Sequence, residues 1–196
     1  MKQDVLASLR AAIVALLAFT VLTGVVYPAL VLAIGQAVFP REANGDPRLV
    51  GQAFTDPAYF WGRPSSVGPS PYDAMTSSGA NLGMGGANTA QPINPALRDA
   101  VADRVKALRA ADPGNTAPVP VDLVTASASG LDPDITPAAA YYQAPRVARL
   151  RGLSVDDVRA LIAQHTKGRA LGFLGEPRVN VVALNRALDA AGHPPR

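Results

Sequence analysis

The sequence predicts an α+β protein in which a single N-terminal transmembrane helix precedes one small mixed α/β soluble domain. Three observations support this fold class. An uncharged, largely apolar stretch covers residues 11–40, a stretch rich in Gly, Pro, Ser and Asn covers residues 42–91, and several patterns with helix start and stop signals follow. About 155 residues remain after the apolar stretch, enough for one domain with its own core.

The apolar stretch is long enough to cross a bilayer. Its inner part, Ala11–Ala33, would form a helix of roughly 35 Å at about 1.5 Å per residue. A cleaved signal peptide is one alternative, but its apolar region usually spans only about 7 to 15 residues. A buried core helix is another, but Ile13–Val26 shows no polar face. We therefore expect residues 1–10 to form an N-terminal tail and residues 11–36 to form a transmembrane anchor.

Pro28 marks a special point within this anchor. It has no amide hydrogen and its ring crowds the carbonyl of Gly24, so we expect a kink near Tyr27. A neighbouring protein helix would make such a kink tolerable in lipid, and Gly24 would let its backbone approach closely. Gly24, Tyr27 and Pro28 are therefore the candidate assembly residues.

The charges that flank the anchor favour a cytoplasmic N-terminus. Lys2, Arg10 and the terminal amine flank one end together with Asp4, whereas Arg41 and Arg48 flank the other together with Glu42 and Asp46, which gives the N-terminal side a modest positive bias. We therefore expect a cytoplasmic tail, and a soluble domain, residues 37–196, that lies in the periplasm.

The stretch after the anchor predicts short strands and ordered loops. Leu49–Phe54 and Ala58–Trp61 are the expected strands. Tyr59, Phe60 and Trp61 form the densest aromatic cluster, which we interpret as core under a loop rather than as a partner surface. Residues 84–93 contain little to bury and are expected to form a flexible insertion.

The second half predicts four helices with a strand, Pro118–Thr125, after the first of them. The expected helices begin at Asn94-Pro95, at Thr136-Pro137, at Ser154 and at Asn180, and they end before Asp112-Pro113-Gly114, Gly152, Gly168 and Gly192. Pro145 is expected to interrupt or kink the second helix.

Composition excludes several kinds of chemistry. The net charge of +3 is dispersed, without a basic cluster that interleaves aromatic residues, so no nucleic-acid partner is predicted. Cysteine is absent, and no phosphate-binding glycine loop is present. His165 and His193 are the only histidines, and His165 is interpreted as a helix C-terminal residue. Asp132 and Asp134 flank Pro133 in a predicted turn. We therefore predict no catalytic residue and no metal ligand.

One segment stands apart, Val124–Thr136, with the sequence VTASASGLDPDIT. Small hydroxylated residues, a glycine and an Asp-Pro pair predict a tight, hydrogen-bonded loop ahead of a helix. The segment resembles the Val-Thr-x-Ser-x-Ser-Gly-Leu-Asp-Pro signature of the C subunit of the Kdp-type potassium-transporting ATPase. That membrane complex also contains a channel-like potassium-binding subunit, a P-type ATPase subunit and a small stabilising subunit.

The resemblance covers nearly the whole chain. The further matches fall in the expected order: Tyr27-Pro28, Gly62-Arg63-Pro64-Ser65, Tyr72, Ser78-Gly79-x-Asn81-Leu82-Gly83, Asn94-Pro95-x-Leu97, Val119-Pro120-x-Asp122-Leu123-Val124, Gln143, Arg146-Val147-Ala148, Gly175-Glu176-Pro177-x-Val179-Asn180-Val181 and Leu184-Asn185. Three departures occur. Asp134 replaces a histidine-like polar residue, Ala128 stands where glycine is frequent, and the connection over residues 84–93 is longer.

The resemblance implies a non-catalytic accessory subunit, single-pass in the cell inner membrane. The family is thought to raise the affinity of the ATPase subunit for ATP, and its Ser-x-Ser-Gly segment has been likened to the signature loop of ABC transporters. Ser127, Ser129, Gly130 and Asp132 are therefore candidates for ligand contact. We expect no cofactor on this chain alone, with ATP and potassium bound through the complex.

Topology decides between two roles for this loop. A periplasmic domain never meets cytoplasmic ATP, so we favour a role in assembling or stabilising the complex, with the domain covering the external mouth of the potassium path. A membrane-anchored envelope binding module or hydrolase is the alternative from another class. Ser127 and Ser129, however, lack the Gly-x-Ser-x-Gly elbow of such hydrolases.

Overall fold

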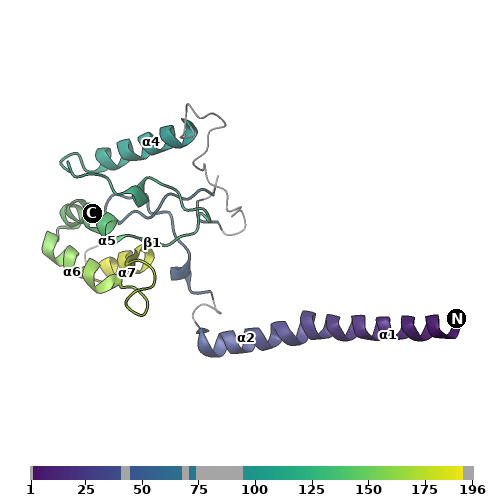
Figure 1. The fold of residues 1–196 in the computed structure, drawn as a ribbon. Coiled ribbons are helices and arrows are strands. Elements are labelled where there is room, and N and C mark those ends of the chain that lie inside the picture. The colour runs from purple at the N-terminus through teal and green to yellow at the C-terminus, as the bar shows by residue number, and fades with distance from the viewer. Residues whose placement is uncertain (1, 41–44, 68–70, 74–94, 192–196) are drawn as a thin grey trace. The chain divides into compact units, whose positions relative to one another are not determined.

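A computed structural model of the chain describes residues 2–40, 45–67, 71–73 and 95–191. The chain divides into two compact units, Met1–Pro47 and Arg48–Arg196 (Figure 1). The insertion predicted over residues 84–93 and the proposed cap Asn94 lie outside the described residues.

The N-terminal unit is one long helical run. It consists of α1 (Lys2–Val21), the π-helical turn η1 (Leu22–Val26) and α2 (Tyr27–Val38). Residues Leu6–Val38 have the length and composition of a membrane span, with a mean hydropathy of 2.2, and none of this span is buried within the structure. The transmembrane helix predicted for residues 11–36 is therefore present as a helix.

The irregularity expected near Tyr27 takes the form of the π-helical turn. The backbone N–H of Tyr27 donates to the carbonyl of Leu22, five residues back. A π turn holds one extra residue, which relieves the crowding that the ring of Pro28 imposes on the preceding turn. The hydroxyls of Thr20 and Thr23 donate to carbonyls four residues back, each at 2.7 Å, so they present no unsatisfied polar group to lipid.

The second unit combines helices with a small sheet. Its elements in chain order are η2 (Pro47–Leu49), α4 (Pro95–Ala111), η4 (Val121–Leu123), β1 (Asp134–Ile135), α5 (Pro137–Arg151), α6 (Val155–His165), β2 (Thr166–Lys167), β3 (Arg178–Asn180) and α7 (Val181–Ala190). Helix α6 packs against both α5 and α7, and β3 contacts all three of these helices. In Figure 1 these three helices form a cluster, with α4 farther out. The α+β fold class predicted from the sequence is confirmed.

Local side-chain caps begin three of the helices where the sequence predicts them. The side chains of Thr136, Ser154 and Asn180 each accept a hydrogen bond from the backbone N–H three residues ahead, at 2.9 to 3.1 Å. Gly152 ends α5 in the left-handed conformation, with φ of 68°. The predicted interruption of α5 is wrong, because the helix continues through Pro145. The alternative, a kink there, stays a prediction. The carbonyl that this proline leaves without an amide partner belongs to the exposed Tyr141, where water can reach it.

The sheet is small and antiparallel, with strand order β1-β3-β2. Ile135 and Thr166 both pair with Val179, which lies on the central strand and is fully buried. These strands have only two or three residues each, too few for a periodic pattern, so the sequence did not reveal them.

The strands predicted over Leu49–Phe54, Ala58–Trp61 and Pro118–Thr125 are absent from the structure, and all three segments are described. Pro118–Thr125 instead contains the 3-10 turn η4, in which the N–H of Leu123 donates to Pro120 at 3.2 Å. The two prolines of this segment have no backbone N–H, and a strand that pairs with a neighbour on each side needs those donors.

Phe60 and Trp61 have the backbone pairing of a strand, but their partners are side chains. Asn185 accepts from Phe60 N at 2.9 Å and donates to Phe60 O at 3.0 Å. Gln143 accepts from Trp61 N at 2.8 Å and donates to Trp61 O at 3.1 Å. We call these two side chains, Gln143 and Asn185, the amide clamp. It satisfies a buried, non-strand backbone with groups from α5 and α7.

The aromatic cluster lies in the core, as predicted. Phe60 has no exposed surface and Trp61 packs against the core as a partly buried residue. The guanidinium of Arg146 lies 4.7 Å from the centroid of the Trp61 ring, and that of Arg151 lies 4.3 Å from the Tyr59 ring. Two buried cations of α5 thus cover the aromatic rings.

Candidate functional site

The candidate loop, Ser127–Asp132, lies beside a segment far away in the sequence. Ser127 forms a parallel bridge with Ser65, and its backbone N–H donates to the carbonyl of Pro64 at 3.2 Å. On the other side, the N–H of Gly51 donates to the carbonyl of Leu131 at 2.8 Å. The loop is therefore held between two stretches of the domain's N-terminal half.

Ser65 is the centre of this arrangement. Its hydroxyl donates to the carbonyl of Gly130 at 2.7 Å and accepts from the backbone N–H groups of Val67 and Tyr72 at 3.2 and 3.1 Å. The hydroxyl of the next residue, Ser66, donates to the carbonyl of Ser127 at 3.0 Å. One pair of serines thus ties the loop to the 63–73 segment.

Gly130 is buried in a conformation and a space that only glycine fits. Its φ is +67°, and its backbone N–H donates to the carbonyl of Ser127 at 3.2 Å. A Cβ there would lie 2.4 Å from Cγ2 of Val67, 2.9 Å from Oγ of Ser65 and 3.0 Å from the Val67 backbone nitrogen. The prediction of a glycine-dependent tight turn is confirmed.

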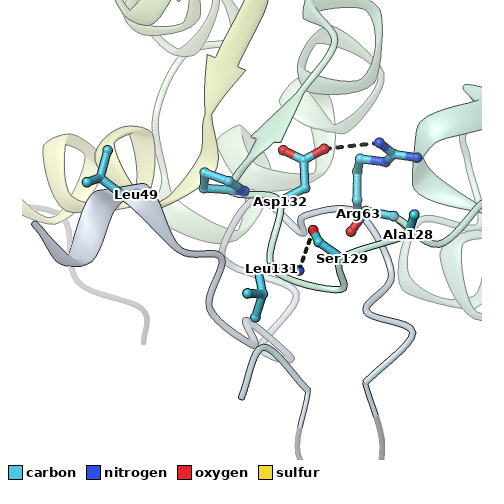
Figure 2. A pocket seen from close by; sticks show the side chains of 8 residues that line it. Leu49, Arg63, Ala128, Ser129, Leu131 and Asp132 are labelled. Atoms are coloured by element: carbon cyan, nitrogen blue, oxygen red, sulfur yellow. Dashed lines mark hydrogen bonds and ion pairs between the residues drawn. The ribbon is translucent and has the colours of Figure 1, made fainter. Parts of the chain in front are cut away.

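The two serines of the signature have different surroundings. Ser127 is only 5% exposed, and its backbone rather than its side chain supplies the contacts described above. Ser129 is exposed, and its hydroxyl accepts from the backbone N–H of Leu131 at 3.2 Å (Figure 2). The Ser129 hydroxyl therefore acts as a turn acceptor within its own loop.

Asp132 closes the loop with both carboxylate oxygens. Oδ2 lies 3.0 Å from Nη1 of Arg63 (Figure 2), and Oδ1 accepts from the backbone N–H of Asp134 at 3.0 Å. Asp134 in turn pairs with Arg178 at 3.0 Å. The turn predicted around Pro133 is confirmed, and both carboxylates are engaged in fixing it.

Tyr72 supports the loop from a conformation that is unusual for tyrosine. Its φ is 64°, and its hydroxyl donates to the carbonyl of Arg63. Burial, together with the negative charge of Asp132, raises the pKa of Tyr72 to about 12, so the phenol stays protonated as this hydrogen bond requires. Its ring fills the space where a Cβ on Gly51 would lie, 2.3 Å from Cε1.

Arg63, Ser65 and Tyr72 were not predicted as site residues. They belong to segments that resemble the family, but no local pattern assigns them a contact. Arg63 and Ser65 contact residues that lie 65 or more positions later in the sequence, so only folding brings these groups together. The match of Gly62-Arg63-Pro64-Ser65 and Tyr72 to the family was the signal available, and it names no contact.

An open hollow of about 540 Å³ lies against the loop, lined by Leu49, Arg63, residues 127–129 and residues 131–133. Its one cationic lining group, Arg63, is already paired with Asp132. The carboxylate of Asp132 thus offsets the positive charge that would attract an anionic ligand. Within the described residues, no group of three His, Cys, Asp or Glu residues could hold a metal ion.

The hydrolase alternative gains no support from this geometry. Ser127 is buried, and the hydroxyl of Ser129 accepts a hydrogen bond from its own loop. His165, the one described histidine, is the last residue of α6, and its Nδ1 lies 3.0 Å from the carbonyl of Leu161. The interpretation of His165 as a helix C-terminal residue is confirmed.

The candidate assembly residues lie in the other unit. Gly24 is in the π-helical turn, and Tyr27 and Pro28 begin α2 immediately after it. All three are exposed, and a Cβ on Gly24 would meet nothing within 4 Å. The surface around the π turn thus has an opening at Gly24. That a neighbouring helix fills this opening remains a prediction.

Comparison with known proteins gives a consistent result. Residues 9–190 match the family model described as "KdpC: K+-transporting ATPase, c chain". Curated relatives named "Potassium-transporting ATPase KdpC subunit" include those of Methylococcus capsulatus and Sorangium cellulosum, each 58% identical. The first alignment covers 92% of this chain and 96% of the relative, and the second covers 95% and 99%. A third, from Variovorax paradoxus, is 56% identical over 93% of this chain.

The match spans both the apolar helix and the domain that carries the Ser-x-Ser-Gly loop, and the relatives have nearly the same length. The resemblance inferred from the sequence motifs is confirmed: the chain belongs to the KdpC family, the c chains of potassium-transporting ATPases.

Proposed function

We propose that this chain is a non-catalytic accessory subunit that assembles or stabilises a potassium-transporting ATPase complex in the cell inner membrane. Its partners would be the channel-like potassium-binding subunit, the P-type ATPase subunit and the small stabilising subunit. The observation that carries the proposal is the family match over residues 9–190, which includes the helix as well as the domain.

The anchor supports this role because its apolar side chains are exposed in the part of the chain that the structure describes. The span Leu6–Val38 has no buried surface. Lipid can cover the apolar side chains. Filling the opening at a glycine with lipid contributes little packing energy, whereas a second helix packs closely there. The π turn places this opening midway along the helix, where a partner subunit would contact it.

The Ser-x-Ser-Gly loop supports a structural rather than a ligand-binding role. Its glycine is enclosed, its aspartate is paired with Arg63, and the hydroxyl of Ser129 accepts a hydrogen bond within the turn. The finer family role, in which this loop raises the ATP affinity of the ATPase subunit, would require these groups to exchange partners. We therefore propose that the loop fixes the shape of the domain, and that the domain lies in the periplasm over the mouth of the potassium path.

The anchor prediction is tested by Gly24→Leu. We expect membrane insertion to be unchanged, because leucine favours insertion by about 0.5 kcal/mol. Recovery of the partner subunits with the tagged chain in mild detergent should fall about tenfold, the effect of losing about 1.4 kcal/mol of packing. Ala18→Leu, another small-to-large change at an exposed position of the same helix, is the control and should copurify normally. Unchanged copurification of Gly24→Leu would contradict the assembly role of the turn.

The loop prediction is tested by Ser129→Ala. Because the exposed hydroxyl supplies one turn hydrogen bond, we expect a stability loss of about 1 kcal/mol or less. The potassium-stimulated ATPase rate and the KM for ATP of the assembled complex should remain as in the wild type. A variant that assembles and folds normally but loses ATP affinity would support the nucleotide role instead.

A further inference from the structure

The segment Ala170–Leu174 is a tight turn that presents apolar side chains to solvent. Leu171, Phe173 and Leu174 are 83%, 68% and 51% exposed, and we call these three side chains the apolar tip. The described part of the domain exposes seven large apolar side chains, of which these are three within four consecutive residues. Clustering of this kind marks an interaction surface, whereas scattered exposed residues do not.

The backbone holds the tip in a fixed geometry. Ala170 and Leu174 exchange two hydrogen bonds, each of 2.9 Å, and the N–H of Gly172 donates to the carbonyl of Arg169 at 3.3 Å. Leu171 has a φ of 53° and Gly172 a φ of 84°, both in the left-handed region. A leucine held in this disfavoured conformation, with its side chain in solvent, indicates a shape maintained for a partner.

Two ion pairs lie at the base of the tip. Nη2 of Arg169 lies 2.9 and 2.7 Å from the two carboxylate oxygens of Glu176. Arg178, near the start of β3, is likewise paired with Asp134 at 3.0 Å. Lys167, which pairs with Arg178 in the sheet, adds one positive charge. One net positive charge falls short of the cluster of basic side chains that engages anionic lipid headgroups.

We propose that the apolar tip inserts into an uncharged, apolar pocket on another protein subunit of the ATPase complex. This proposal rests on the proposed function, since it takes the partner from the same complex. A fixed turn with three apolar anchors and a polar rim of paired charges has the anatomy of an interface hot spot. A bilayer surface accepts apolar side chains in any arrangement, so it gives no reason for the fixed turn or for the paired charges.

Photo-crosslinking in the full complex tests the contact directly. Phe173 is replaced by the photoreactive p-benzoylphenylalanine, and the complex is irradiated both in membranes and in detergent. We expect one adduct with another protein subunit, formed about tenfold more efficiently than from the same probe at Val121, which is equally exposed at 69%. Adducts with lipid alone, or protein adducts no more abundant than those from Val121, would overturn the proposal.

Substitution tests whether the contact contributes to affinity. The double change Leu171→Ser and Phe173→Ser should reduce retention of the chain in the complex about tenfold or more, as the loss of interface anchors does. The urea midpoint of the domain should stay unchanged, since both side chains are exposed in the free chain, and Val121→Ser is the matched control. Unchanged retention would overturn the proposal. If the wild-type chain itself failed to copurify with other subunits, the proposed function would fail; if it copurified and only the tip results failed, only this inference would fall.

Discussion

Gly130→Val destabilises the domain by roughly 2–4 kcal/mol, with contributions from a left-handed backbone and from steric overlap. The overlap is severe because the new Cβ would lie 2.4 Å from Val67 Cγ2 and 3.0 Å from the Val67 backbone nitrogen. Rotation of a side chain cannot relieve the contact with the backbone nitrogen, so the 63–67 segment must move and its hydrogen bonds to the loop must lengthen. Urea unfolding of the full chain in detergent, followed by the fluorescence of Trp61, measures the loss.

Trp61 is a suitable probe for this experiment because it is the only tryptophan and packs against the core. Gly168→Val provides the matched control, since a Cβ there meets nothing within 4 Å and its φ is not in the left-handed range. The control should unfold within about 0.5 kcal/mol of the wild type. If Gly130→Val were as stable as the control, the account of a shape-determining loop would be wrong.

Gln143→Leu removes half of the amide clamp and lowers the unfolding free energy by roughly 3–5 kcal/mol. Leucine has nearly the same volume, so the loss comes from polar groups rather than from a cavity. The backbone N–H and carbonyl of Trp61 would both lose their partners, and Nη2 of Arg146 would lose its 2.7 Å acceptor. Nη2 of Arg146 would keep the Tyr59 carbonyl as an acceptor at 3.1 Å. The other losses are costly because the polar groups concerned are partly buried.

Gln164→Leu is the control for this substitution. Gln164 lies on an exposed position of α6, so the same chemical change there should alter the unfolding free energy by only about 0.5 kcal/mol. A loss for Gln143→Leu no larger than this would show that the Trp61 backbone finds other partners. The clamp would then be dispensable for the fold.

Sequence-based prediction succeeded for interactions between residues that are close in the sequence and failed for those between distant residues. The helix starts at Thr136, Ser154 and Asn180 were predictable because each cap joins residues three apart. Phe60 and Trp61 were predicted as a strand, since aromatic residues favour strands, but their backbone partners are side chains more than 80 residues away. No local pattern reports such pairing, and strands of two or three residues leave no periodicity to find.

The same distinction applies to the features of the candidate loop. The turn chemistry of Gly130 and Asp132 was predictable because the residue types themselves favour it. The contacts that fix the loop in the domain were not, since Arg63, Ser65 and Tyr72 reach it from a distant part of the chain. Similarly, Pro28 predicted an irregular helix, but the choice of a π turn over a sharp kink depends on backbone geometry throughout the preceding turn.

The location of the domain decides between a structural role and a nucleotide-affinity role, because only a cytoplasmic domain meets ATP. The chain contains no cysteine, so a single introduced cysteine is an unambiguous reporter. Ala107 is an exposed position on α4, and Gln3 precedes the membrane span. In intact cells we predict that Ala107→Cys reacts with a small membrane-impermeant maleimide and that Gln3→Cys reacts only after lysis. Labelling of Gln3→Cys with protection of Ala107→Cys would place the domain beside cytoplasmic ATP and contradict the account.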